Sequence, residues 1–526
     1  MSYQEAKRID MWSEDGPFSK GYIDNTQNLF LMDGASPYLR NCRLDGNSII
    51  QRPWHWLFAT LTAGSYPKGI GGYLRTTASN DRLVVRHNID ATHKLSTITT
   101  AGVTADILTD SNISSDARMF FQNVGDVIYC MNWVDYFGKL NGTTYTVPST
   151  GVSNFAPSFS VIFNSSHWAS GWSTNANKVY KSVWDNYEDF NSTGSDTFTF
   201  GEALTWLCAN NEALFYFTKS TISVTGTGDI TDTAWTITYV TRPLEVKEGS
   251  VNHASIVSAG NMIYFLTPSN KLGIVTKGQS NEWFEVQELS ERKYAGISTI
   301  LSGLAVDQSD SFGYYLPKEN IIKWFVKSAG SSINDICIIY DIGKDAFLVD
   351  DGKYFFGGLF FKGANYTISM VEPKVYQDEY GNDDEDGAIG FEYRTKEYYI
   401  SDPTYKKILR ESRTLLDINE LASLTQEIWI DEAQADTKTV DSDNITISVW
   451  GIGTDPVWTF AIGEDGWWED TDYQEIYILR TKGNLNKIGR KVQFRYTNQV
   501  VGSKVRLKNI SAKVEIKPEL SSNLTT

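Results

Sequence analysis

The sequence predicts an all-β protein, and three patterns in it indicate this class. Runs of four to eight residues rich in Val, Ile, Thr and aromatic residues recur along the chain, and Gly, Asn and Asp separate them. Stretches with apolar residues at helical spacing are scarce. Turn sequences followed by strand-forming runs recur at intervals of roughly 40 to 60 residues. Such a chain is expected to form one locally paired sheet after another.

The repeat is clearest in two segments, 124–132 (VGDVIYCMN) and 259–267 (AGNMIYFLT). Each reads as a Gly-Asp or Gly-Asn turn followed by a strand. Related turns precede strand-like runs near positions 80, 165, 211 and 319, the last with different chemistry. The spacing of these turns overlaps that of four-stranded propeller blades.

These repeats predict a β-propeller of about six blades over residues 60–377. One four-stranded sheet cannot bury both of its faces, whereas sheets packed radially bury the faces of their neighbours and leave short edges. The alternative is a set of unrelated β-hairpins, because Gly-Asp and Gly-Asn turns are common in β proteins. Residues 1–59 are expected to form a hairpin region that closes or flanks the propeller, with a turn at Asp45-Gly46 and a strand ending at Pro53.

An acidic linker, residues 378–387, separates the propeller from a predicted C-terminal β-sandwich at 388–516. Residues 517–526 are expected to be frayed. The stretch between Tyr405 and Leu424 is the best helix candidate, but its pattern leaves helix and strand open. Strand-like runs in the sandwich region occur at 389–393, 427–430, 445–450, 475–479, 491–496 and 505–516.

The charge balance narrows the possible partners. The chain has 64 acidic and 47 basic residues, a net charge of −17, which argues against a general nucleic-acid binder. It does not exclude a channel through which DNA slides without sticking. No run approaches the roughly 18 apolar residues of a membrane span, and the start lacks a signal-peptide core. The four cysteines lie far apart in strand-like stretches, so we expect buried free thiols and a reducing site of assembly.

Catalytic and metal-binding patterns are not found. None of the five histidines has the spacing of a zinc site, and the sequence has no G-x-S-x-G elbow, Walker loop or Rossmann glycine pattern. The S-x-D-x-G-x-T-W turns typical of sialidase-like propellers are also missing. The sequence therefore predicts a protein that is not an enzyme, with no catalytic, metal or cofactor-binding residue and no cofactor.

The acidic linker supplies the candidate site residues. They are Asp378, Glu379, Asp383, Asp384, Glu385 and Asp386, predicted to belong to a loop that faces a lumen or an interface. A calcium site is an alternative, because clustered carboxylates suit hard cations. The run lacks the alternating order of an EF-hand loop, which favours a solvated linker instead.

Two passages resemble known phage proteins. The segment from Gly34 to Pro53 resembles the opening of propeller-type tail proteins of tailed bacteriophages. Those proteins often carry the pattern "N-x-R-x-D-x-G, then R-P-G". This sequence departs from it in two places, because Asp45 and Gly46 are adjacent and Trp54 stands where glycine is usual. The segment from His167 to Phe190 is similar to their mid-propeller pattern, in which a strand with a rim glycine precedes "x-V-Y-x-S" and "G-D-x-x-D-F". Residues 202–208 and 222–226 resemble the next blade, and 386–396 resembles the entry to a C-terminal sandwich.

This order of landmarks resembles the nozzle, or tail-hub and packaged-DNA-stabilisation, proteins of short-tailed phages. The resemblance implies a virion protein assembled in the host cytoplasm, with six copies in a ring. It also implies portal and adaptor proteins above the ring, tail fibres or tailspikes on its outside, and transient passage of DNA through it. None of the matched residues is catalytic.

Two other functions stay open. One is a carbohydrate- or receptor-binding propeller of a phage fibre, in which Trp54, Trp56, Trp467 and Trp468 could stack on sugars; packing between strands is the plainer explanation of these residues. The other is a glycoside hydrolase, which would need a pair of carboxylates that the sequence alone cannot single out.

Overall fold

The fold divides into two compact units in this computed structural model. Residues 57–343 and 351–378 form one, here called the propeller unit, and residues 1–56, 344–350 and 379–526 form the other, here called the terminal unit. The structure describes residues 9–15, 20–23, 35–46, 48–89, 92–109, 113, 115–172, 174–210, 212–226, 237–239, 248–277, 284–289, 297–380, 387–399, 406–418, 423–441, 474–480 and 488–517.

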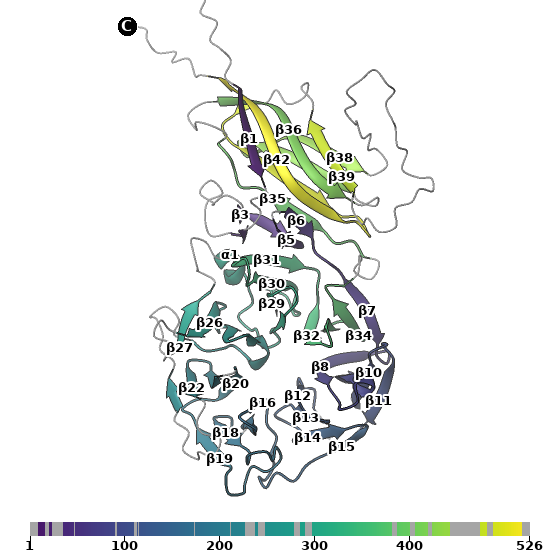
Figure 1. Cartoon of the computed structure of the whole chain (residues 1–526), viewed down its shortest axis with the longest axis vertical. Coiled ribbons are helices and arrows are strands. Elements are labelled where there is room, and N and C mark those ends of the chain that lie inside the picture. The colour runs from purple at the N-terminus through teal and green to yellow at the C-terminus, as the bar shows by residue number, and fades with distance from the viewer. Residues whose placement is uncertain are drawn as a thin grey trace, which may run out of the picture. The chain divides into compact units, whose positions relative to one another are not determined.

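Seven four-stranded antiparallel sheets occur among the described residues. In Figure 1 the first strands that are labelled lie nearest the centre of a ring of sheets. Six sheets take their strands in chain order: β8 (Ser65–Tyr73), β9 (Arg82–Ile89), β10 (Thr92–Thr99), β11 (Thr104–Thr109); β12 (Phe120–Val124), β13 (Val127–Met131), β14 (Gly138–Asn141), β15 (Thr144–Thr146); β16 (Ser160–Phe163), β17 (Ser166–Ser170), β18 (Lys178–Lys181), β19 (Asp196–Thr199); β20 (Leu204–Ala209), β21 (Ala213–Thr218), β22 (Ile222–Gly226), β23 (Ile237–Tyr239); β24 (Val257–Ala259), β25 (Met262–Leu266), β26 (Leu272–Lys277), β27 (Phe284–Glu288); and β28 (Phe312–Leu316), β29 (Ile321–Val326), β30 (Ile336–Asp341), β31 (Ala346–Asp351).

The seventh sheet differs because its outer strand comes from the other end of the propeller sequence. Its order is β32 (Phe355–Phe361), β33 (Ala364–Ser369), β34 (Lys374–Asp378) and then β7 (His55–Thr60). The Leu61 N–H donates to the Pro373 carbonyl at 2.7 Å, and the side chains of Ala59 and Leu61 join the cluster around Ile368. A strand that precedes the first sheet therefore completes the last one, and this pairing closes the ring.

The β-propeller prediction is confirmed, with seven sheets where about six were expected. The turns near residues 80, 125, 165, 211, 260 and 319 each join the first strand of a sheet to its second. The seventh such connection is Lys362-Gly363, where φ is 52° and 83°. This connection has the left-handed backbone of a tight turn but not a Gly-Asp or Gly-Asn sequence, so the turn motif did not reveal the seventh sheet.

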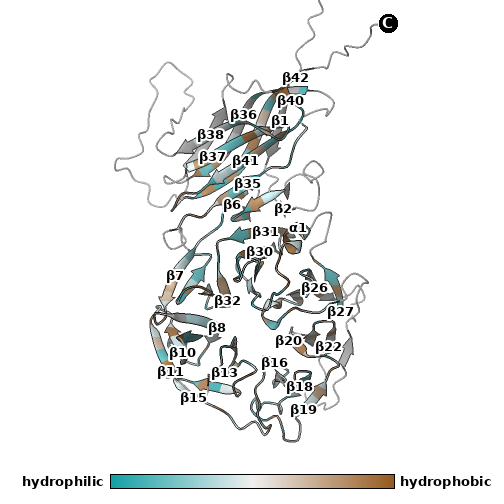
Figure 2. Cartoon of the chain, turned by 180° about the vertical axis from the view of Figure 1, so that it is seen from behind, coloured by the Kyte–Doolittle hydropathy of each residue, from teal (hydrophilic) through white to brown (hydrophobic). Residues whose placement is uncertain are grey.

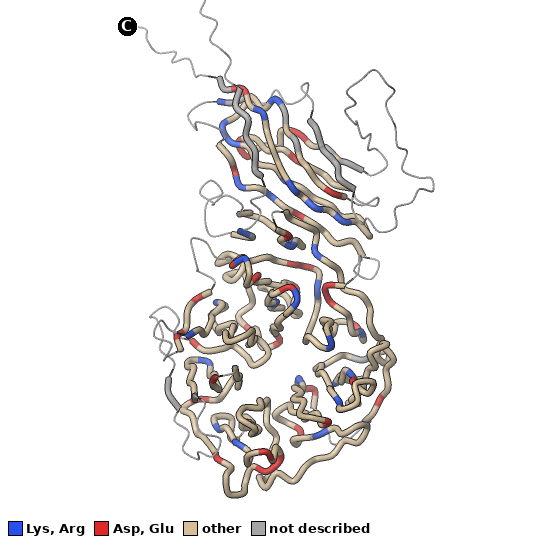
Figure 3. Tube along the Cα trace, viewed as in Figure 1, with Lys and Arg blue, Asp and Glu red and all other residues tan. Residues whose placement is uncertain are grey.

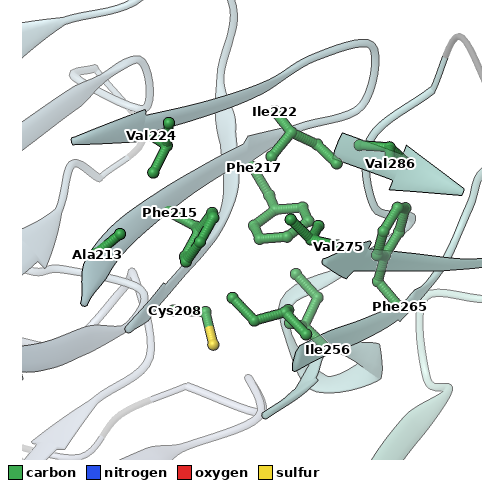
Figure 4. Packing of buried hydrophobic residues seen from close by; sticks show 11 residues of the cluster. Cys208, Ala213, Phe215, Phe217, Ile222, Val224, Ile256, Phe265, Val275 and Val286 are labelled. Atoms are coloured by element: carbon green, nitrogen blue, oxygen red, sulfur yellow. The ribbon is translucent and has the colours of Figure 1, made fainter. Parts of the chain in front are cut away.

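Neighbouring sheets bury apolar side chains against each other. Figure 4 shows this between the fourth and fifth sheets, where Phe215 and Phe217 of β21 face Phe265 of β25 and Val275 of β26. The rings of Phe217 and Phe265 meet edge to face with centroids 5.4 Å apart. Cys208 lies in the same cluster. Such contacts repeat around the ring, which makes the propeller a set of interlocked layers rather than separate hairpins.

Two sheets form the core of the terminal unit. The larger has the order β39-β36-β42-β6-β5, with β1 paired to β42 and β40 paired to β36, and the smaller has the order β38-β37-β41-β35-β4. Their bounds are β1 Ile9–Asp15, β4 Tyr38–Arg40, β5 Cys42–Asp45, β6 Ser48–Gln51, β35 Phe391–Arg394, β36 Lys406–Ile418, β37 Ser423–Ile430, β38 Ala433–Asp441, β39 Gln474–Arg480, β40 Ile488–Gly489, β41 Val492–Asn498 and β42 Val505–Lys517. A two-stranded parallel sheet, β2 (Gly21–Tyr22) and β3 (Ala35–Ser36), is also present.

Buried polar side chains link these two sheets. Gln426 of β37 donates to the Thr414 hydroxyl of β36 at 2.8 Å and to the Tyr496 hydroxyl of β41 at 2.9 Å. All three side chains are buried, so the larger and smaller sheets lie face to face. Strands from residues 9–15 and 38–51 belong to these sheets, and the hairpin at Asp45-Gly46 is the connection between β5 and β6.

The stretch between Tyr405 and Leu424 forms strands wherever it is described, so a helix there is wrong. It contains β36 and the start of β37. In β37 every second residue is buried, from Leu424 through Gln426 and Ile428 to Ile430. Figure 2 shows hydrophobic and hydrophilic residues interleaved along the strands. Pairing with β42 and β39, which no local pattern reveals, decides the conformation of β36.

The four cysteines are free and buried, which confirms the prediction of buried thiols. Burial raises the pKa of the Cys208 thiol to about 12 and raises that of Cys130 further. Among the described residues, no helix is long and apolar enough to cross a membrane.

Candidate functional site

A cavity of about 180 Å³ lies where the inner strands of the propeller begin. Its wall is made by the first residues of β12, β28 and β32, by residues of β8 and β20, and by the short 3-10 helix at His253–Ser255. Most of the lining side chains are apolar. Three nitrogen-bearing side chains, Arg118, Trp206 and His253, are part of the wall. The cavity thus combines an apolar surface with a few polar groups, the composition usual for ligand sites.

Arg118 is a buried cation in the wall of this cavity and is 8% exposed. Its guanidinium donates to the carbonyls of Ser311 (3.1 Å), Asp310 (2.7 Å) and Phe356 (2.9 Å), and it lies 4.0 Å from the centroid of the Phe356 ring. Arg118 precedes the second sheet, whereas its acceptors belong to the sixth and seventh. The side chain therefore connects sheets that are not neighbours in the ring.

Among the described residues, no carboxylate oxygen lies within 4 Å of the Arg118 guanidinium, so its charge has no close counter-ion there. Burial lowers the pKa of Arg118 to about 10, an effect that Asp310 partly offsets. At neutral pH the group is therefore a buried positive charge whose hydrogen bonds go to neutral carbonyl oxygens. Such a charge attracts an anion if one can enter.

His253 lies among aromatic rings beside the same cavity. Its imidazole is stacked on Trp206 with centroids 5.6 Å apart and meets Phe120 edge-on at 3.9 Å. Burial and the charge of Arg118 lower the pKa of His253 well below its ordinary value, so the ring is neutral. Its Nε2 is buried and has no hydrogen-bond partner. A buried polar atom of this kind costs about 1–3 kcal/mol, which a hydrogen-bonding ligand would recover.

An exposed apolar loop stands next to His253. It joins β13 to β14 and carries Trp133, Val134 and Tyr136, with exposed fractions of 39%, 52% and 51%. The Trp133 ring lies 6.4 Å from that of His253, and its backbone has a φ of 61°. For a bulky residue, such a left-handed backbone is uncommon and points to a constrained position.

The loop is held by a buried polar network. Asn132 accepts hydrogen bonds from the N–H groups of Val134 (3.2 Å) and Asp135 (2.8 Å) and donates to the Asp135 carboxylate at 2.5 Å. Asn132 and Asp135 are both buried. The exposed side chains therefore project from a fixed support.

Comparisons with known proteins add only to the description of the fold. No protein-family model and no curated protein matches the sequence. Among solved structures the chain is similar to YCF48 bound to a D1 peptide, with 12% identity over 60% of this chain and 93% of that chain and a TM-score of 0.37. It is also similar to PorZ, a surface component of the type-IX secretion system of Porphyromonas gingivalis, with 10% identity over 64% of this chain and 42% of that chain and a TM-score of 0.36. The chain thus spans less than half of the PorZ structure.

The structure corrects the placement of Asp378, which was predicted in an exposed loop. Asp378 is the last residue of β34 and is 1% exposed. Its carboxylate pairs with Lys323 and with Lys353 (2.6 Å), and it accepts a hydrogen bond from the Tyr314 hydroxyl at 2.6 Å. Burial alone would raise its pKa, but the two lysines outweigh burial and hold it well below the ordinary value. The many acidic residues at 378–387 indicated that Asp378 would be exposed to solvent. Instead, two lysines distant in the sequence pair with its carboxylate and allow it to be buried.

The other residues of the acidic run divide into two groups. Glu379 belongs to the terminal unit, where its carboxylate pairs with Arg43 at 2.5 Å and its side chain is 3% exposed. Glu379 is therefore also not an exposed loop side chain. Asp383, Asp384, Glu385 and Asp386 lie outside the described residues.

The remaining sequence-based candidates are accounted for as follows. Trp54 is buried at 2% exposure, as strand packing predicted, whereas Trp56 is 50% exposed. Trp467 and Trp468 lie outside the described residues. Across the described ranges, no three His, Cys, Asp or Glu side chains gather as a metal site would require. Sequence reasoning missed Arg118 and His253, because each is a single residue in a connection and no spacing pattern marks it.

Proposed function

We propose that the protein is a structural component of a bacteriophage tail, a nozzle or hub that retains packaged DNA and conducts it during ejection. The observation that carries this proposal is the order of the sequence landmarks from residue 34 to residue 396. The fold supports it because each landmark has a defined place. The first is the β5–β6 hairpin, the second spans β17 and β18, and the last leads into β35 of the terminal unit.

The size of the cavity inside the propeller indicates where a DNA channel would form. Its central cavity is only about 180 Å³ and is walled by Arg118, His253 and aromatic side chains. A cavity of this size does not admit DNA. We therefore expect the channel to form between copies of the chain, in a homo-oligomeric ring of six that lies below the portal and adaptor proteins and bears fibres or tailspikes.

The charge distribution gives this proposal a testable detail. Acidic and basic residues are interspersed along the sheets of the propeller (Figure 3). By contrast, β36 and β42 each carry four basic residues and together only three acidic ones, in a chain of net charge −17. A surface that lets DNA slide must avoid phosphate contacts. We therefore expect β36 and β42 to lie away from the lumen.

Imaging of the intact virion tests the proposal. A cryo-EM reconstruction is expected to place six copies of the chain in a ring between the adaptor and the tip of the tail. Mass photometry of the purified chain, alone and with its portal–adaptor complex, provides the second measurement. A chain that stays monomeric in both samples and does not appear in virions would rule out this function.

A second candidate function is recognition of a carbohydrate or receptor by the propeller. The exposed Trp133, Val134 and Tyr136 on a fixed loop favour it, because sugars stack on exposed aromatic rings. A glycan-array screen of the intact chain separates the two functions. Specific binding that is lost in Trp133→Ala would favour recognition, and a blank array would favour the nozzle.

A further inference from the structure

The central cavity has the features of a ligand site, which the proposed tail function does not use. The first feature is its size. A cavity of about 150 Å³ in a protein core takes up benzene, whereas pockets for drug-sized ligands are about 300–1,000 Å³. About 180 Å³ is enough for an organic molecule of the size of a substituted benzene.

The second feature is a single buried positive charge. Arg118 lies in the wall, is 92% buried and has no carboxylate within 4 Å in the described part of the chain. Three carbonyl oxygens orient its guanidinium, but they do not balance its charge. Asp310 is the nearest acidic group to influence it, and the Asp310 side chain is 40% exposed and pairs with Lys327 at 3.2 Å. Arg118 thus offers one buried positive charge, which a monovalent anion balances. The next cation, Lys68, is half-buried, and its ammonium lies 5.3 Å from the centroid of the Phe356 ring.

The third feature is an unpaired polar atom in the same wall. His253 Nε2 is buried without a partner, and Arg118 is close enough for its charge to act on the imidazole. The Nε2 atom has almost no accessible surface, so a ligand reaches it only when the rings around it, Trp206 and Phe120, shift. In the tautomer that carries its proton on Nε2, the neutral ring then donates a hydrogen bond to an oxygen atom, and together with Arg118 it matches the two oxygens of a carboxylate. Of the other wall residues, Trp206 carries an indole N–H, whereas Ile256 and Phe312 have apolar side chains.

We propose that this cavity binds a small organic carboxylate of about the size of benzoate, with its carboxylate held by Arg118 and His253 and its apolar part against Ile256 and Phe312. This site is independent of the tail function, because it depends only on residues within one propeller.

Calorimetry and ligand-detected NMR on the purified full chain test the proposal, with benzoate as the probe. Benzamide, which has the same shape without the charge, and inorganic phosphate are the comparison probes. We expect benzoate to bind at least tenfold more tightly than benzamide, and phosphate to show no binding. No binding of benzoate at about 10 mM to the folded chain, or equal binding of benzamide, would overturn the proposal.

Two variants assign the binding to this cavity. Arg118→Gln keeps hydrogen-bond donors for the carbonyls but removes the charge, and we expect at least a tenfold loss of benzoate affinity. His253→Phe keeps the aromatic packing and removes the nitrogen, with a severalfold loss. Lys139→Gln, at a surface pair with Glu188, is the matched control and should bind benzoate like the wild type.

Thermal unfolding of each variant shows whether it folds. If Arg118→Gln does not fold, the His253→Phe variant and the ratio of benzoate to benzamide affinity decide the result. Unchanged benzoate binding by either folded variant would contradict a site at this cavity.

Discussion

Replacing Asp378 with Asn tests how much the buried charges stabilise the propeller. Asp378, Lys323 and Lys353 all have side chains with no exposed surface, and the carboxylate contacts both ammonium groups. The Asn variant leaves these two cations buried without that carboxylate. Removing one partner of a buried ion pair costs about 3–5 kcal/mol. The propeller unit has about 300 residues, so an unfolding entropy of about 2.1 cal/mol/K per residue converts 4 kcal/mol into a drop in Tm of about 6 °C.

Differential scanning calorimetry and urea unfolding, followed by tryptophan fluorescence, measure this change. Asp307→Asn is the matched control, because the Asp307 carboxylate is 77% exposed and 3.8 Å from Lys327, a pair worth little in water. In the Asp378→Asn background, Lys353→Met should recover part of the loss by removing one of the buried cations. The reasoning fails if Asp378→Asn unfolds within about 1 °C of the wild type, or no earlier than the control.

Three further predictions concern pH, packing and thiol access. Burial lowers the pKa of His87 and of His167 to about 4, against about 6.5 in an unfolded chain. The free energy of unfolding should therefore be highest above pH 6.5 and fall as the pH drops towards 4. Urea midpoints measured between pH 7.5 and 5 should vary less in His167→Gln than in the wild type, and an equal variation in both proteins would contradict this prediction. Gly171→Ala should lower the Tm, because the added Cβ would lie 1.5 Å from the Asn175 carbonyl oxygen. Gly201→Ala is the control and should leave the Tm unchanged, because no atom lies within 4 Å of its added Cβ. Equal Tm values for the two variants would refute the packing argument. A thiol reagent should label four cysteines in urea and none in the native chain, and rapid native labelling would show that the thiols, including Cys208, are accessible.

The sequence was informative where the structure is local. Each first-to-second strand connection with a Gly-Asp, Gly-Asn or related turn could be located, because those residues adopt the backbone that the turn requires. The seventh sheet was not predicted, because its turn is Lys362-Gly363 and its outer strand β7 lies far from β34 in sequence. A pairing between distant segments leaves no local pattern. The same reason explains why β36 could not be distinguished from a helix.

The candidate site shows the same limit more strongly. Arg118 and His253 precede inner strands of different sheets, 135 residues apart in the sequence, and only the closed ring brings them together. Asp378 was misplaced for a related reason. Its partners Lys323 and Lys353 lie elsewhere in the sequence. The composition of residues 378–387 shows only that this segment is acidic and contains no sign of these two lysines.

The closing strand has a consequence for how the protein is made. β7 ends at Thr60, and its partner β34 begins at Lys374, so the ribosome must add more than 300 residues before the two can pair. At about 5–20 residues per second this takes roughly 15–60 s. During that time the first sheets can form, but the ring stays open and its apolar sheet faces lack their last neighbour. A circular permutant that begins at β8 and places residues 55–60 after β34 would make this pairing local, and its refolding would be faster if the pairing of β7 with β34 limits the rate.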